Sequence, residues 1–203
     1  MDTGTLIFIL IIVAVPWLAV IIYGTLSNKG ILKNYKSLAE KYSFELDSSK
    51  KSGLRKHPVV KGTYRNIPVE IGTFINPEGK KSTATYVNAS CSNPTGFEFL
   101  IVKRNHSNTV KYGGKDYTVN DTEFDSKFIV NTNNGEKIFS MLNFSIKYKL
   151  LQSLNVGFKG ELKLEGNKLS YVENELIKNN INLLRIEIIL HLLCEISDEI
   201  KSN

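Results

Sequence analysis

The stretch "VVKGTYRNIPVEIGTF", Val59 to Phe74, carries the pattern that decides the fold. Alternation of apolar and polar residues with a period of two predicts a strand, and a short break between two such strands predicts a hairpin. Here the break is the dipeptide Arg65-Asn66. The alternating small or apolar residues around it are Val60, Gly62, Tyr64, Val69 and Ile71. The stretch therefore predicts two antiparallel strands joined by a tight turn.

Similar patterns recur along the rest of the chain. Gly113-Gly114 divides "NTVKYGGKDYTV" and Gly166-Asn167 divides "ELKLEGNKLSYVE", so each stretch predicts a further hairpin. "STATYVNASCS" and "FEFLIVKR" are rich in strand-forming residues and flank the turn signal "NPTG", which predicts another. "KFIVNT" predicts one more short strand. Tight hairpins require antiparallel pairing, so we expect an antiparallel sheet.

Three segments have the spacing of helices. "ILKNYKSLAEKYSF" places apolar residues on one side and lysines on the other. "NINLLRIEIILHLLCEISDEI" is apolar over much of its circumference and predicts a largely buried helix. "EKIFSMLNFSIKYKLLQSLN" also predicts a helix, although its part "FSIKYKL" alternates like a strand. Its i, i+4 ridge consists of Ile138, Leu142, Ile146, Leu150 and Leu154.

Hairpins interspersed with helices predict an α+β fold. We expect a curved antiparallel sheet or partial barrel packed with helices, and a pleckstrin-homology-like arrangement is one candidate. This domain is expected over residues 44–203, preceded by a basic amphipathic helix over residues 29–43.

The N-terminal run "TLIFILIIVAVPWLAVIIYG", residues 5–24, contains no charged residue. Twenty helical residues span roughly 30 Å, the thickness of the hydrocarbon core of a bilayer. A cleaved signal peptide is the alternative, but no Lys or Arg precedes the run and no A-x-A site follows it. The run therefore predicts a transmembrane helix.

The basic residues predict an orientation for this span. Lys29, Lys33, Lys36 and Lys41 follow it, and positive residues favour the cytoplasmic side. We expect a single-pass protein of the cell membrane, with the N-terminus outside and the domain in the cytoplasm. The same four lysines are candidates for contact with anionic lipid headgroups. Because the excess of basic residues lies between residues 29 and 65 and not across the whole domain, we expect no nucleic-acid partner.

The sequence contains none of the common nucleotide-binding, zinc-protease or hydrolase motifs. Asp121, Glu123 and Asp125 in "VNDTEFDSKFIV" would share one side of an extended chain and could bind a divalent cation. On a helical turn, by contrast, Asp121 would cap the helix while Phe124 and Phe128 packed together. We favour the capped turn, followed by a strand.

A second set of candidate metal ligands lies on the last helix. Glu187, His191 and Glu195 share one face at i, i+4 spacing and have suitable chemistry. A solvated stripe is the commoner arrangement, and we expect neither metal nor cofactor. Cys91 and Cys194 are expected to be reduced core residues, with one long-range disulfide as the alternative.

The succession of "YKSLAEKYSF", "HPVVKGTYRNIPVEI", "DTEFDSKFIV" and "GELKLEGNKLSYVE" resembles uncharacterised prokaryotic proteins. These have one N-terminal membrane helix and a small α+β domain of unknown function. The resemblance covers most of the chain, and its motifs are structural. It therefore implies a fold and no catalytic residue.

The function expected from these features is that of a membrane-anchored cytosolic interaction domain. It would recruit a protein partner or contact anionic lipid, without catalysis of its own. Two alternatives remain open. One is a membrane-tethered hydrolase or metal-dependent enzyme that uses the acidic residues above, and the other is an extracytoplasmic sensor.

Overall fold

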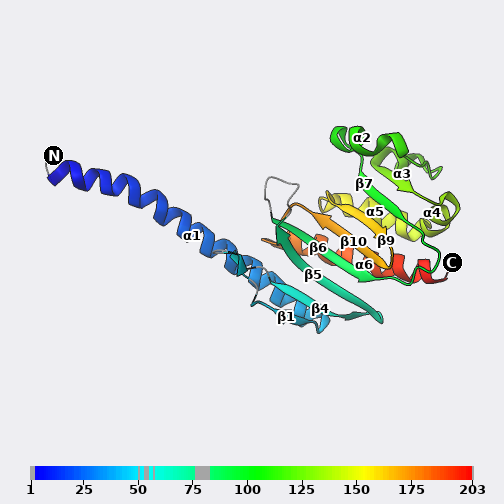
Figure 1. Ribbon diagram of the computed structural model, residues 1–203, viewed down its shortest axis with the longest axis horizontal. Coiled ribbons are helices and arrows are strands. Elements are labelled where there is room, and N and C mark those ends of the chain that lie inside the picture. Colours follow the sequence, from blue (N-terminus) through cyan, green and yellow to red (C-terminus); the bar gives the residue numbers. More distant parts are fainter. Residues whose placement is uncertain (1–2, 50, 53–54, 57, 76–82, 203) are drawn as a thin grey trace.

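The computed structural model describes residues 3–49, 51–52, 55–56, 58–75 and 83–202. Within these residues, eight strands form one antiparallel sheet in the order β1-β4-β5-β6-β10-β9-β7-β8 (Figure 1). The strands β2 (Lys51–Ser52) and β3 (Arg55–Lys56) pair separately. The eight strands are β1 (Glu45–Asp47), β4 (Val59–Tyr64), β5 (Ile67–Ile75), β6 (Thr83–Ser90), β7 (Phe99–Lys103), β8 (Phe128–Thr132), β9 (Glu161–Glu165) and β10 (Lys168–Glu173).

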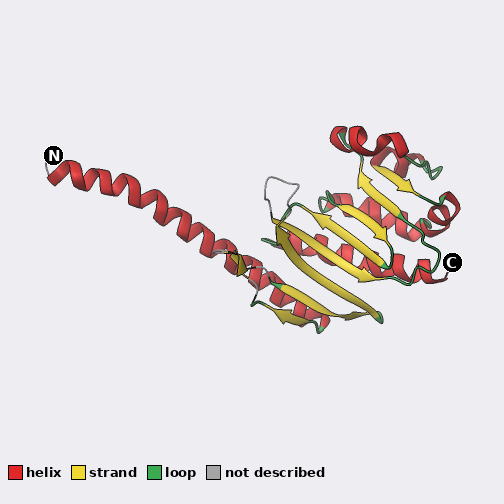
Figure 2. Ribbon diagram, in the orientation of Figure 1, coloured by secondary structure: helices red, strands yellow, loops and turns green. Residues whose placement is uncertain are grey.

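The helices α1, α5 and α6 cover one face of this sheet (Figure 2). The helices α5 and α6 pack against each other, and α6 lies on β6 and β10. The second half of α1 lies on β1 and β4. The core between these layers is apolar. The helical segments are α1 (Thr3–Tyr42), α2 (His106–Tyr112), the 3-10 turn η1 (Gly113–Lys115), α3 (Thr122–Lys127), α4 (Gly135–Met141), α5 (Phe144–Asn155) and α6 (Asn180–Ser202).

The hairpin predicted from residues 59–74 is confirmed. β4 and β5 pair in the register that places Val60 opposite Ile71. Arg65 and Asn66 have φ angles of 53° and 62°, the left-handed pair that a two-residue hairpin turn requires. The predicted hairpin of β9 and β10 is confirmed as well, with Gly166 in the left-handed region. Both turns are encoded locally, in the residues that form them.

The predicted hairpin around "NPTG" is wrong in its pairing. Both strands form, but β6 lies between β5 and β10, whereas β7 lies between β9 and β8. The β9–β10 hairpin, which comes some 60 residues later in the chain, separates them. Turn residues show that the chain bends, but the neighbours of a strand depend on the whole sheet.

The predicted hairpin around Gly113-Gly114 is also wrong. The segment forms α2 and η1, because the Asn105 side chain accepts a hydrogen bond from the Asn108 N–H and caps the helix. The residues after η1 then run beside the edge strand β8. The Tyr117 N–H donates to the Val130 carbonyl at 2.6 Å, and the Val130 N–H donates to Asp116 Oδ1 at 3.0 Å. This segment therefore occupies hydrogen-bonding groups of β8 at the edge of the sheet.

The long helix predicted over residues 136–155 is helical but divided. α4 ends at Met141, and Asn143 caps α5 by accepting from the Ile146 N–H at 3.1 Å. The part that also alternates like a strand is helical. The predicted ridge is largely buried, since Ile138, Leu142, Ile146 and Leu150 are each at most 3% exposed.

The predicted membrane span over residues 5–24 is wrong. In the part of the chain that the structure describes, no helix is both long enough and apolar enough to cross a membrane. Residues 5–24 belong to α1, which continues without a break through the predicted juxtamembrane helix 29–43. An uncharged run of this kind predicts a helix but not what surrounds it. The cytoplasmic placement of the domain stays a prediction.

The second half of α1 is part of the folded domain. Ile31, Tyr35 and Leu38 are buried against the sheet, and the Asn34 amide donates to the Ile177 carbonyl. The first half projects away from the sheet (Figure 1). The α+β class is confirmed, but the strands form one open sheet rather than a barrel or a pleckstrin-homology-like arrangement, with β1 and β8 at the edges of the described residues.

Candidate functional site

The acidic residues of "VNDTEFDSKFIV" form a capped turn, as predicted. Asp121 caps α3 by accepting from the Phe124 N–H at 3.1 Å and pairs with Lys147 Nζ at 2.6 Å. The hydrogen bond from Lys147 lowers the pKa of Asp121. Both oxygens of Asp125 accept backbone N–H groups, from Val119 and Asp121. Glu123 is exposed. These carboxylates hold the turn together.

Glu187, His191 and Glu195 share a helix face but interact with different neighbours. Glu187 pairs with Lys41 of α1 at 2.8 Å, and Glu195 accepts from Ser145 Oγ at 2.6 Å and from Lys149 Nζ. The His191 ring lies between two tyrosines, with Nε2 3.1 Å from the Tyr42 hydroxyl and Nδ1 2.8 Å from the Tyr64 hydroxyl. Burial, together with nearby positive charge on Arg65, lowers the pKa of His191.

Among the described residues, no three His, Cys, Asp or Glu side chains converge in a way that could hold a metal ion. The four lysines predicted to contact lipid are exposed on α1, where Lys41 pairs with Glu187. Contact of Lys29, Lys33, Lys36 and Lys41 with lipid stays a prediction. Cys91 and Cys194 are buried free thiols. The candidate metal ligands do not converge among the described residues, so the open face of the sheet is the next place to consider.

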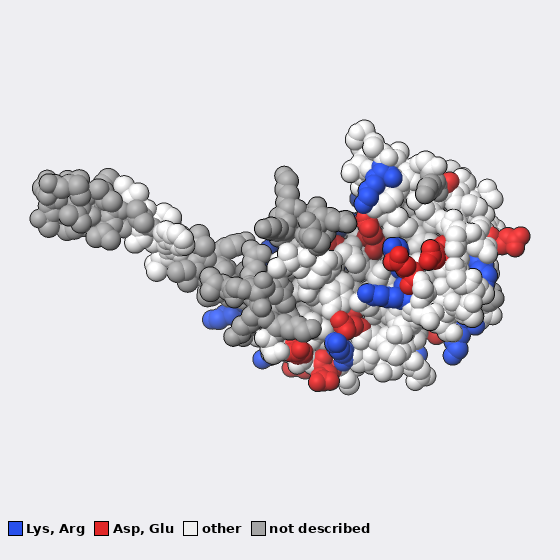
Figure 3. All heavy atoms as spheres, in the orientation of Figure 1, with Lys and Arg blue, Asp and Glu red and all other residues white. Residues whose placement is uncertain are grey.

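The open face is the side of the sheet opposite α5 and α6. Val69 and Ile71 point into the core, so Glu70 between them points outward. The registers of the paired strands align Glu70 with one residue on each of the other strands, and these residues form a row across the sheet. That row consists of Glu45, Lys61, Glu70, Asn88, Ser170, Lys163, Leu100 and Asn131. Figure 3 shows acidic and basic side chains next to each other over this face.

One end of the open face is covered. Val102 of β7 and Ile129 of β8 lie opposite each other in register and are fully buried, although they point away from the main core. The helix α2 and the turn η1 pack on β8 there. The centre of the face, formed by β4, β5, β6 and β10, is left open.

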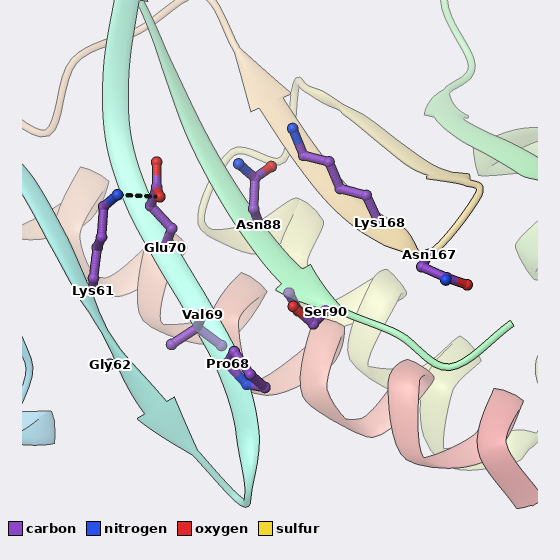
Figure 4. A pocket seen from close by; sticks show the side chains of 10 residues that line it. Lys61, Gly62, Pro68, Val69, Glu70, Asn88, Ser90, Asn167 and Lys168 are labelled. Carbon is purple, nitrogen blue, oxygen red and sulfur yellow. Dashed lines mark ion pairs between the residues drawn. The ribbon is translucent and has the colours of Figure 1, made fainter.

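A hollow of about 590 Å³ lies at this centre, between β4, β5, β6 and β10. Figure 4 shows Lys61, Glu70, Asn88 and Lys168 rising from the strands on the same side, with the helices behind them. Glu70 pairs with Lys61 at 2.9 Å and accepts a hydrogen bond from the Tyr86 hydroxyl. The charge of Glu70 is therefore already engaged.

Lys168 and Asn88 differ from Glu70 in this respect. Among the described residues, neither side chain has a hydrogen bond or ion pair. The acid opposite Lys168 in register is Glu165, which pairs instead with Lys163 at 2.8 Å. The hollow thus contains an ammonium group and a carboxamide that have no protein partner among the described residues.

The tyrosine that orients Glu70 depends on a glycine. A Cβ at Gly72 would lie 2.5 Å from the Tyr86 hydroxyl and 2.6 Å from its ring, so the ring of Tyr86 lies directly across Gly72. Gly72 and Tyr86 are opposite each other in the register of β5 and β6. The glycine makes room for the aromatic ring, and the ring places its hydroxyl beside Glu70.

Beneath the sheet lies a buried ion pair that orders the domain. Both the Nε and the Nη2 of Arg185 donate to Glu173 at 2.8 Å, and Nη2 also donates to Glu175 at 2.6 Å. Arg185 and Glu173 are each 2% exposed. The Tyr171 hydroxyl donates to Glu173 at 2.7 Å and accepts from the Gly160 N–H at 3.1 Å. These contacts join α6 to β10, and neither charged residue lines the central hollow of the open face.

Two buried tyrosines give a matched prediction for stability. The Tyr35 hydroxyl has no hydrogen-bond partner among the described residues, and burial raises the pKa of Tyr35. Because an unsatisfied buried hydroxyl is costly, Tyr35→Phe should raise the free energy of unfolding by about 1 kcal/mol. Tyr171→Phe should lower it by about 1–3 kcal/mol, because Glu173 and the Gly160 N–H would lose a partner. Urea denaturation measures both, and equal losses in the two variants would contradict the assignment.

The residues of the open face were not singled out from the sequence. A signal was present, because Glu70, Asn88 and Ser170 occupy the outward positions of three strands with clear alternation. That alternation shows which side each residue faces but not which strands are neighbours. The pairing of β6 with β10 brings together residues that are some 80 positions apart.

Comparison with known proteins supports the fold. No protein-family model matches the chain, and no curated protein matches it. The crystal structure of the mycobacterial trehalose monomycolate transport factor A, TtfA, is similar, with a TM-score of 0.55 and 13% sequence identity. The match covers 84% of this chain and 94% of that chain. The resemblance to uncharacterised membrane proteins stays a prediction, and the chain has the α+β fold of this transport factor.

Proposed function

We propose that this chain is a protein-interaction domain that binds a segment of a partner protein on the open face of its sheet. The observation that carries the proposal is the central hollow, where Lys168 and Asn88 have no partner among the described residues. The charged residues beside them do form ion pairs, Lys61 with Glu70 and Lys163 with Glu165. A partner would supply the missing acceptor and donor.

The shape of the hollow favours a polypeptide over a small molecule. Small-molecule sites enclose most of their ligand and are lined mainly by apolar side chains. Here the lining comes from four adjacent strands, lies on one side only and includes two lysines and a glutamate (Figure 4). An extended segment can lie across such a surface and place its backbone amides against the Asn88 carboxamide.

A second surface serves as a comparison. Phe144 and Tyr148 on the outer side of α5 are 83% and 53% exposed, and their rings stack at 6.2 Å. Exposed aromatic residues are common in protein interfaces. These two residues carry no charge, however, whereas the hollow is lined by Lys61, Glu70 and Lys168. We therefore assign the partner to the open face and use α5 as the control surface.

The name of the similar structure is consistent with a binding role. That structure belongs to a protein named as a transport factor, and such a role requires contact with other molecules. For this chain we infer only that it binds a partner. The trehalose monomycolate in the name of TtfA refers to that protein.

The proposal is tested by filling the hollow. Unconstrained peptides of random sequence, displayed in a library, would be selected on the purified full chain, and binding of the enriched peptides measured by fluorescence polarisation. Ser170→Trp places an indole beside Asn88 and should weaken binding by about tenfold or more, since each lost hydrogen bond to a charged group costs about 1.5–3 kcal/mol. Gln152→Trp adds the same bulk to the exposed side of α5 and should leave binding unchanged. Selection of no peptide, or equal binding by both variants, would contradict the proposal.

A further inference from the structure

We infer that the partner segment is acidic and extended, with an apolar side chain at one end. This inference rests on the proposed function and specifies the chemistry of the partner. It follows from the charges and the apolar residues along three connected hollows of the domain.

The three hollows share lining residues and so form one groove. The central hollow shares Glu70, Asn88 and Lys168 with a hollow of about 400 Å³ on one side. In the other direction it continues, through Ser90 and Asn167, into a hollow of about 620 Å³ beside the turn of the β4–β5 hairpin. The groove therefore follows the strands of the open face from Phe74 to Pro68 and then passes the β4–β5 turn to reach the C-terminal end of α6.

The two ends of the groove differ in chemistry. At one end lie Phe74, Tyr86 and Val172, with the two aromatic rings 6.1 Å apart. This end suits an apolar side chain. At the other end lie Arg65 and Lys201, together with Asp198 of α6.

The charges along the groove are unbalanced. Arg65, Lys168 and Lys201 have no ion pair among the described residues, and Asp198 is the acid of the lining that is likewise unpaired there. Glu70, by contrast, is engaged by Lys61 and Tyr86. Three available cations face one available anion. Complementary charge on a partner would improve both its rate of association and its specificity.

The length of the groove sets the size of the segment. Phe74 and Pro68 line opposite ends of the sheet part of the groove and are six positions apart on β5. A strand rises about 3.3 Å per residue, so this part is about 20 Å long. An extended segment of about six residues fits it, with an apolar residue near Tyr86 and a carboxylate near Lys168. A second carboxylate would reach Arg65 and Lys201.

The test is a charge reversal in the peptide selection described above. Peptides enriched on the full chain should combine an aromatic or aliphatic residue with at least two Asp or Glu residues. Lys168→Glu should weaken the binding of such a peptide by about tenfold or more. Lys127→Glu makes the same change of charge on the exposed side of α3, away from the groove, and should leave the affinity unchanged. Replacing the critical Glu of the peptide by Lys should restore binding to the Lys168→Glu variant.

The outcomes distinguish failure of the acidic segment from failure of the proposed protein-interaction function. Enriched peptides that lose binding in Ser170→Trp but carry no acidic residue would overturn this inference and leave the proposed function standing. The same holds if Lys168→Glu binds as well as the unaltered chain. Selection of no peptide would overturn both. Tighter, Lys168-dependent binding of an oligothymidylate probe would overturn the protein partner in favour of a nucleic acid.

Discussion

Arg185→Ala is expected to lower the free energy of unfolding by about 3–5 kcal/mol, because it leaves a buried charge without its partner. Glu173 is 2% exposed and receives two hydrogen bonds from Arg185. Arg185 also donates to the Val156 carbonyl at 3.0 Å and to Glu175, so its loss removes a donor from that carbonyl as well, whereas Glu175 keeps its ion pair with Lys159. Chemical denaturation of the full chain measures the change.

The matched control for this variant is an exposed ion pair. Lys61 is paired with Glu70 but its side chain is 57% exposed, so Lys61→Ala should cost no more than about 1 kcal/mol. Replacing Arg185 and Glu173 together by methionine should recover part of the stability lost in Arg185→Ala, since neither charge then remains buried. An Arg185→Ala variant that loses no more stability than Lys61→Ala would show that the buried pair does not secure α6 to the sheet.

Phe124→Ala is expected to lower the free energy of unfolding by about 3–5 kcal/mol, the usual cost of emptying a buried phenylalanine site. Phe124 is fully buried and stacks on Phe128 at 4.9 Å, and Phe128 meets Phe158 edge-on at 5.5 Å. The capped turn places these rings in the core. Thermal or urea unfolding of the variant measures the loss.

A second variant separates the ring from the cap of the same helix. Asp121→Ala removes the N-cap of α3 and the ion pair to Lys147, and should cost about 1 kcal/mol. The effect of Phe124→Ala should therefore be several times larger. If the two losses were equal, Phe124 would contribute no more than the cap, and its assignment as the main core contact of the turn would be wrong.

Local features of this fold could be predicted from the sequence because few residues encode each of them. The turn at Arg65-Asn66 and the cap at Asp121 follow from the conformations and side-chain groups of four or five consecutive residues. The position of α6 in the core follows similarly from its apolar circumference. Arg185 within that apolar run was a signal for a buried ion pair. Its partner Glu173, however, lies on β10, and local sequence does not identify it.

Features that depend on distant parts of the chain were predicted poorly. Gly113-Gly114 was consistent with a hairpin, yet the residues that follow it bond to the edge strand β8 and not to a strand before the glycines. The apolar N-terminal run predicted a helix, yet the sequence did not show that this helix runs without a break into the predicted helix over residues 29–43. Spacing on α6 grouped Glu187, His191 and Glu195, whereas neighbouring elements separate them.

The candidate site also depends on contacts between distant parts of the chain. Lys168 and Asn88 meet because β10 pairs with β6. Whether Lys168 has an ion-pair partner depends on Lys163, which takes Glu165, and on Lys61 and Tyr86, which take Glu70. A sequence shows the number of charges but not how they pair. The unpaired cations of the groove could therefore be identified only from the structure.

The central claim is that a partner protein lies on the open face of the sheet, and site-specific photo-crosslinking in the host cell tests it most directly. A photoreactive amino acid would replace Ser170 in the groove or, in a separate chain, Gln152 on the outer side of α5. The account predicts a discrete cross-linked adduct with one partner from position 170, its loss in the Lys168→Glu background, and no such adduct from position 152. An adduct from position 152 but not from position 170 would contradict the account.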